Sequence, residues 1–146
     1  MLRTLKGYPK AINLLLTGTL VLTLARAITL PYLVIYLNSA FGLPVSDIGL
    51  VIGSSLILGS LLSLYGGFLV DRTPSHRLIL GCCALFTLGF VGTFTARQLW
   101  LFYLCLVLIN LAYAVIDIAI KAGFAQRLPV EQRSEAFSIK YTLTNI

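Results

Sequence analysis

The sequence predicts an all-α membrane protein with four transmembrane helices and the start of a fifth. Of its 146 residues, 58% are hydrophobic and only 11% are charged. A soluble domain is roughly 45–50% apolar and about 25% charged. The apolar residues also gather in long segments, and the mean hydropathy is +0.94. This composition excludes a water-soluble globule, a disordered chain and a secreted disulfide scaffold.

The predicted helices follow from the length of the apolar segments. A β-strand has about 10 residues at most and alternates with a period of two, which none of the segments does. In hydrocarbon, every backbone N–H and C=O group must be paired within the protein, and a helix achieves this. A fifth helix is expected to begin near residue 134 and to be cut off at residue 146. The sequence thus predicts a single membrane domain over 1–146, with spans at 11–37, 48–70, 78–95 and 99–120.

The connections between these segments are short, and all but the tight turn at 96–98 contain glycine or proline. The first carries Gly42 and Pro44, and Ser46 or Asp47 is expected to cap the second helix. Pro31 interrupts the first segment, where it frees a backbone carbonyl and allows a kink.

The basic residues predict the orientation in the membrane. Arg97 is the single basic residue on one side, whereas seven lie on the other. Because Lys and Arg are enriched on the cytoplasmic side, we expect a multi-pass protein of the inner (plasma) membrane with a cytoplasmic N-terminus. Basic loops also explain the net charge of +6 without a nucleic-acid partner. The seven residues are Arg3, Lys6, Lys10, Arg72, Arg77, Arg127 and Arg133.

A cleaved signal peptide is the alternative reading of the first segment. Basic residues precede an apolar run, and Ala25-Arg26-Ala27 has the spacing of a cleavage site. The apolar run continues to Leu37, however, which is long enough for a span. The spanning helix is therefore favoured.

The fourth segment carries a polar face made of Asn110, Tyr113, Asp117 and Lys121. The spacing i, i+3, i+7 and i+11 places them on one side of a helix, and Asp117 and Lys121 form an i,i+4 pair. An ionisable group inside a bilayer costs several kcal/mol unless it is paired or hydrated, so we interpret this face as part of a substrate pathway. The structural alternative is that Lys121 snorkels to the interface and Asp117 neutralises it.

Arg26 is a second charge inside a predicted span. At 1.5 Å per residue it lies about 16 Å from the outer end of the first segment, while Asn110 lies about 16 Å and Asp117 about 27 Å from the outer end of the fourth. The depths match Arg26 to Asn110 and Tyr113 better than to Asp117. We assign Arg26 to the same pathway, with a purely structural pairing as the alternative.

Small residues form a stripe along the second segment. Ser55, Gly59, Ser63 and Gly67 follow one another at strict i,i+4 spacing. Such a stripe lets the backbone of a neighbouring helix approach closely, so we predict a packing surface.

The cysteines predict neither a metal site nor a disulfide framework. Cys82, Cys83 and Cys105 are odd in number, lie in apolar segments and lack C-x-x-C spacing. A thiol-oxidising membrane enzyme would need a cysteine pair in the outer connections, 38–47 and 96–98, which contain none. We therefore expect no enzyme, no cofactor and no metal.

The connection between the second and third segments, from Gly67 to Arg77, reads GFLVDRTPSHR. It resembles the signature G-x-L-a-D-r-x-G-r-k of the major facilitator superfamily. Pro74 stands in place of the second glycine, and Arg77 supplies a basic residue one position late. The matching residues are Gly67, Leu69, Asp71 and Arg72.

The first and fourth segments look like those of the drug-efflux branch of this family, although Asn110 stands near the place of the arginine in its proton-coupling motif. The resemblance implies a secondary transporter built of two six-helix halves around a central cavity. It implies efflux of a small molecule across the inner membrane by an antiporter, with a conformational switch at the loop of Asp71, Arg72 and Arg77. The expected partners are the lipid bilayer, a small-molecule substrate, protons as coupling ion and the missing second half.

Two alternatives remain at this stage. The chain is a complete four- or five-helix protein that works as a homo-oligomer, or it is a truncated fragment without transport of its own.

Overall fold

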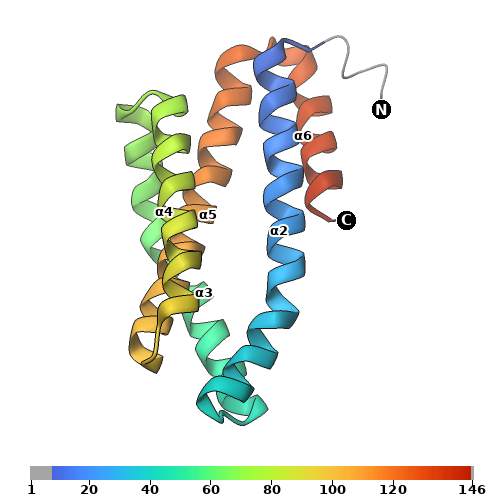
Figure 1. Ribbon diagram of the computed structural model, residues 1–146. Helices are drawn as coiled ribbons and strands as arrows, with labels where there is room; N and C mark the ends of the chain where they lie inside the picture. The colour runs from blue at the N-terminus through green and yellow to red at the C-terminus, as the bar shows by residue number, and fades with distance from the viewer. Residues whose placement is uncertain (1–7, 146) are drawn as a thin grey trace. The chain divides into compact units, whose positions relative to one another are not determined.

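A computed structural model describes residues 8–145, which form five α-helices and, within that range, no strand (Figure 1). Four of the helices, α2 to α5, are long and apolar enough to cross a membrane. The predicted all-α membrane architecture is therefore confirmed. The helices are α2 (Lys10–Phe41), α3 (Val45–Arg72), α4 (Ser75–Thr95), α5 (Leu99–Arg127) and α6 (Val130–Thr144).

Several helix ends differ from the sequence prediction. The helix α5 continues beyond residue 120 to Arg127, because helical backbone hydrogen bonding does not stop where the apolar run does. The helix α6 begins directly after Pro129, before the expected start at 134. Pro44, and neither Ser46 nor Asp47, takes the N-cap position of α3. A proline suits a helix start because its φ is fixed and the first backbone donors have no partner within the helix.

The helix α2 runs without a break through the proline that allowed a kink and through the spacing of a signal-peptide cleavage site. Pro31 stands inside it, and Ala25-Arg26-Ala27 also lies within it. Arg3 and Lys6, which entered the charge count, lie outside the described residues.

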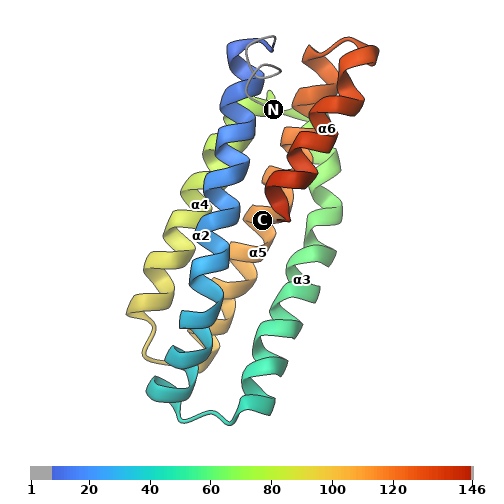
Figure 2. The same cartoon turned by 90° about the vertical axis from the view of Figure 1, so that its right-hand side faces the viewer.

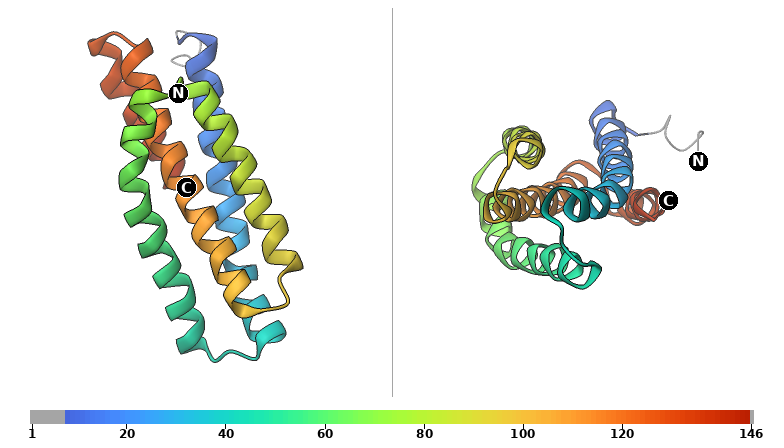
Figure 3. Two further views of the ribbon diagram at one scale, coloured as in Figure 1. Left: turned by 90° about the vertical axis from the view of Figure 1, so that its left-hand side faces the viewer. Right: turned by 60° about the horizontal axis from the view of Figure 1, so that its bottom comes forward.

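The chain divides into two compact units, and the larger comprises Leu33–Ala119. In this unit the 99–119 part of α5 lies between α3 and α4 (Figures 2 and 3). Two glycines of α4 make its contact with α5 close. A Cβ added to Gly89 of α4 would lie 2.6 Å from Cγ1 of Ile109, and one added to Gly92 would lie 2.5 Å from Sγ of Cys105. The absence of side chains at these glycines thus permits α4 to pack against α5.

The other unit combines the chain up to Tyr32 with the chain from Ile120 onward. Phe124 of α5 is fully buried, and its ring meets that of Phe137 of α6 edge-on with centroids 5.7 Å apart. Nε of Arg133 donates a hydrogen bond of 2.9 Å to the carbonyl oxygen of Leu128, which ties the first turn of α6 to the turn before it.

Candidate functional site

A polar contact joins α3 and α5 within the membrane-spanning part of the larger unit. Nδ2 of Asn110 donates a hydrogen bond of 3.1 Å to the hydroxyl oxygen of Ser55. Ser55 is fully buried, and its own hydroxyl donates to the carbonyl oxygen of Ile52 at 2.7 Å. Nearer the start of α5, the Tyr103 hydroxyl donates to Oγ of Ser54 at 3.1 Å. These bonds satisfy polar groups that have little access to water, which fixes the register of the two helices.

The backbones of α3 and α5 also come together at Gly59. A Cβ built on Gly59 would lie 2.6 Å from Cβ of Asn110 and 3.0 Å from the backbone nitrogen of Leu111. Gly59 and Ser63 are both buried on this surface. Part of the predicted small-residue stripe, from Ser55 to Ser63, thus lies on a buried face of α3.

Gly67, the last member of the predicted stripe, differs from the rest. A Cβ there would meet no atom within 4 Å, whereas one on Gly66 would lie 2.9 Å from Cγ2 of Val115. The reason is helical geometry: with 3.6 residues per turn, twelve residues beyond Ser55 bring Gly67 about 120° around the helix, while eleven bring Gly66 only about 20°. Gly66 therefore takes the packing position that the strict i,i+4 pattern assigned to Gly67.

Tyr113, Asp117 and Lys121 are each half-buried on α5. Asp117 lies about 27 Å along the helix from Leu99 and about 15 Å from its end at Arg127. Lys121 lies about 9 Å before that end. The extension of α5 therefore places both charges farther from a helix terminus than the apolar run indicated. None of the three residues is without an interaction partner.

Arg26 is half-buried on α2 and belongs to the smaller unit, whereas Asn110, Tyr113 and Asp117 belong to the larger one. Arg26 is also not without a partner. Its match in depth with Asn110 and Tyr113 stays a prediction.

The helix ends on either side of the short α3–α4 connection carry exposed charged side chains. Asp71 and Arg72 are the last two residues of α3, Arg77 lies in the first turn of α4, and all three are exposed. The guanidinium carbon of Arg72 lies 4.1 Å from the ring centroid of Phe68, a cation–π contact that holds the side chain along α3. The carbonyl oxygen of Leu69 accepts a hydrogen bond from the backbone N–H of Thr73, which closes the helix. This end of the unit thus presents one carboxylate and two guanidinium groups.

Lys140 is a buried charged residue that the sequence analysis did not single out. Its side chain on α6 is only 2% exposed, and Nζ lies 5.5 Å from the ring centroid of Tyr141. In the sequence, the sign of a special position is that Lys140 is the single lysine of the fifth helix.

Tyr8, before the start of α2, carries a perturbed phenol in the same unit as Lys140. Burial raises the pKa of Tyr8, and the negative charge of Glu135 on α6 raises it further. The phenol is therefore neutral under all ordinary conditions, and it marks where the chain before α2 meets α6.

Comparison with known proteins places this arrangement in a family. Residues 15–146 match the family model of the Major Facilitator Superfamily. No solved structure matches the chain.

Three relatives show the extent of the similarity. The chain is 35% identical over 94% of its length to the uncharacterized MFS-type transporter YdeE of Escherichia coli (strain K12), of which it covers 35%. It is 30% identical over 90% of its length to the uncharacterized MFS-type transporter YqjV of Bacillus subtilis (strain 168), of which it covers 32%. A Na(+), Li(+), K(+)/H(+) antiporter of Planococcus maritimus is 24% identical over 97% of the chain, which covers 34% of that protein.

The chain thus spans about a third of the length of the relatives that it matches. All three relatives are named as transporters. The family match covers nearly the whole chain and agrees with the helical membrane architecture. The chain belongs to the major facilitator superfamily.

Proposed function

We propose that this chain is the N-terminal portion of a secondary active transporter that exports a small molecule, of the drug-efflux type, in exchange for protons. The observation that carries the proposal is Asp117: a half-buried carboxylate far from either end of a helix that is apolar enough to cross a membrane. Such a group is expensive in a bilayer and is the usual carrier or counter-charge along a transport pathway. Its membrane is the inner (plasma) membrane, with the N-terminus on the cytoplasmic side.

The remaining polar residues have separate proposed roles. Asn110 and Tyr113 offer hydrogen-bonding groups to a substrate, and Arg26 offers a positive charge. Asp117 takes up and releases the proton, and Lys121 supplies a positive charge one turn away on the same helix. The last residues of α3 and the first turn of α4 hold one conformational state by pairing their charges with a second half of the transporter. The residues of this switch are Gly67, Leu69, Asp71, Arg72 and Arg77.

A second candidate is exchange of a monovalent cation for protons. The relative from Planococcus maritimus is named as a Na(+), Li(+), K(+)/H(+) antiporter. A carboxylate such as Asp117 provides the oxygen ligands that these hard cations need. The two candidates share the proton step and differ in the substrate.

Proton exchange in everted membrane vesicles tests both candidates. A chimera carries this chain in place of the matching segment of YdeE, and a pH-sensitive dye reports proton release when a substrate is added. Efflux predicts a response to cationic organic dyes, and cation exchange predicts one to Na⁺, Li⁺ or K⁺. In either case, Asp117→Asn should abolish proton release. Binding of a cationic organic dye should remain, whereas binding of Na⁺, Li⁺ or K⁺ should weaken because the variant lacks the carboxylate ligand.

The charge-neutralising role of Asp117 predicts a different pattern. There, Asp117→Asn alone should reduce the amount of folded protein, and Asp117→Asn with Lys121→Gln should restore it. Full proton exchange by the single variant at normal expression would contradict both roles. The matched control is Asp47→Asn, which removes a carboxylate at the exposed start of α3 and should leave exchange unchanged.

A further inference from the structure

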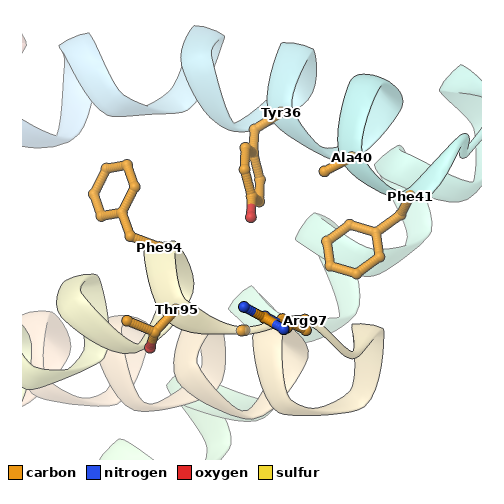
Figure 4. A pocket seen from close by; sticks show the side chains of 7 residues that line it. Tyr36, Ala40, Phe41, Phe94, Thr95 and Arg97 are labelled. Atoms are coloured by element: carbon orange, nitrogen blue, oxygen red, sulfur yellow. The ribbon is translucent and has the colours of Figure 1, made fainter.

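A cavity of about 510 Å³ opens in the larger unit, at the end where α2 stops and α4 turns into α5 (Figure 4). Three aromatic rings and one guanidinium group face it. Tyr36 points from α2 toward Arg97 in the turn, with Phe41 on one side and Phe94 on the other (Figure 4). The lining residues are Tyr36, Ala40, Phe41, Phe94, Thr95, Ala96 and Arg97.

The aromatic wall of the cavity rests on a buried ring. Phe102 of α5 is fully buried, and its centroid lies 5.6 Å from that of Tyr36 and 5.8 Å from that of Phe41. These contacts hold Tyr36 and Phe41 in place. Phe94 also lines the cavity but is 79% exposed, so most of its ring remains open to the surroundings. The site therefore combines a fixed inner wall with an apolar face open to the surroundings.

Arg97 supplies the charge. Its side chain is exposed, and within residues 8–145 no hydrogen bond or ion pair occupies its guanidinium group. A guanidinium carries five N–H donors in a planar fork that fits the oxygens of a phosphate. Because Arg97 is the single basic residue in the connections at this end of the unit, 42–44 and 96–98, an anion has one place to bind here.

The position of the cavity decides which anion it suits. It lies at the ends of three helices that are long and apolar enough to cross a membrane, with Phe41 and Thr95 as the last residues of α2 and α4. Helix ends of this kind meet the headgroup layer, where aromatic side chains are enriched. Anionic lipid headgroups lie at this level of a bilayer, and the exposed ring of Phe94 offers an apolar surface for the acyl chain attached to such a headgroup.

We propose that this cavity binds an anionic phospholipid, with its phosphate on Arg97 and the upper part of an acyl chain on Phe94. The proposal is independent of the transport reaction and of the substrate. A free phosphate has the same anionic group but lacks the apolar part that Phe94 would contact.

The single tryptophan of the chain provides a local probe. Trp100 lies three residues beyond Arg97 in the first turn of α5, is 64% exposed, and donates from Nε1 to Oε1 of Gln98. The 146-residue chain is reconstituted in phosphatidylcholine vesicles at physiological salt. Quenching of Trp100 fluorescence is measured with phosphatidylglycerol brominated in the upper acyl chain, and with phosphatidylcholine brominated in the same place.

We expect the brominated phosphatidylglycerol to associate about fivefold more strongly than the phosphatidylcholine, since one basic residue contributes about 1 kcal/mol to binding of an anionic lipid. Arg97→Gln should abolish this preference. Arg97→Lys should lower it, because an ammonium group lacks the planar, two-pronged donor arrangement of a guanidinium group. Arg77→Gln, which removes a positive charge at the other end of the unit, should leave it unchanged. Circular dichroism verifies that each variant keeps its helical content.

Three results would overturn the proposal. One is equal quenching by the two lipids in the unaltered chain. Another is a preference that survives Arg97→Gln, or that Arg77→Gln reduces as much as Arg97→Gln does. The third is loss of the preference when millimolar inorganic phosphate or glycerol phosphate is added, because the site would then bind a free anion and not a lipid.

Discussion

Asn110 of α5 hydrogen bonds to Ser55 of α3, with Nδ2 and Oγ 3.1 Å apart, next to the point where Gly59 lets the two backbones meet. A polar residue assigned to the pathway is thus also a packing residue. Substitutions of Asn110 will therefore change stability as well as transport, and the two effects have to be separated.

A double-mutant cycle on Ser55 and Asn110 should reveal their coupling. Ser55→Ala, Asn110→Ala and the double variant are compared by the free energy of unfolding in mixed micelles. We expect a coupling energy of about 0.5–1.5 kcal/mol, the range of hydrogen bonds between membrane helices. Ser60→Ala, an exposed serine of the same helix, is the control and should show no coupling with Asn110. Additive effects of Ser55 and Asn110 would show that the bond contributes nothing.

A methyl group at Gly59 should destabilise the larger unit. The new Cβ would lie 2.6 Å from Cβ of Asn110 and 3.0 Å from the backbone nitrogen of Leu111, so α5 itself has to move. Overpacking of this kind costs about 1–3 kcal/mol. Gly53→Ala is the matched control, because its Cβ meets nothing within 4 Å, and it should change the free energy of unfolding by less than about 0.5 kcal/mol. Equal unfolding curves for the two variants would refute the close approach.

The proposed orientation predicts a labelling pattern. In a variant without Cys82, Cys83 and Cys105, a cysteine at Ser39 should react with a membrane-impermeant thiol reagent added to whole cells. A cysteine at Ser75 should react only after the cells are opened, because the basic loops stay in the cytoplasm. Both positions lie near helix ends, at the ends of α2 and α4 respectively. The opposite pattern would reverse the assigned topology.

The phenol of Tyr8 should titrate above its ordinary pKa of about 10. Burial raises the pKa of Tyr8 first and the charge of Glu135 adds to it, so Glu135→Gln should lower this pKa without bringing it back to the ordinary value. A raised pKa means that the folded state holds the proton more tightly. The associated stability is therefore complete below about pH 10 and is lost as the pH rises through the folded-state pKa.

The ¹³Cζ chemical shift of Tyr8 between pH 8 and pH 12 gives this pKa, and Tyr8→Phe identifies the signal. Glu131 is another exposed carboxylate of α6, the helix that carries Glu135. The control variant Glu131→Gln should leave the Tyr8 pKa unchanged. A Tyr8 pKa that does not respond to Glu135→Gln would contradict the electrostatic contribution.

The fold was predictable from the sequence because membrane helices are determined locally. Long apolar segments and short connections between them predict α2 to α5 without knowledge of any contact. Helix ends were less predictable, since α5 continues to Arg127 through a polar stretch in which hydropathy carries no signal.

The pairing of helix faces is a different kind of information. Asn110 and Ser55 were each singled out, one for a pathway and one for packing, but their hydrogen bond depends on which helices are neighbours. The packing position lies at Gly66 and not at the predicted Gly67 for a simpler reason. A strict four-residue repeat does not stay on one face of a helix with 3.6 residues per turn over three turns. Lys140 was missed because its burial arises from tertiary packing.

The tight junction at Gly59 has a mechanical consequence. There is no room for even one additional carbon atom between α3 and α5 there, so the two backbones are in direct contact at that point. The close contact at Gly59 and the hydrogen bond of Asn110 couple the positions of the two helices. A displacement of α5 at this junction would act directly on α3, and the same continuous helix carries Asp71 twelve residues, or about 18 Å, farther along.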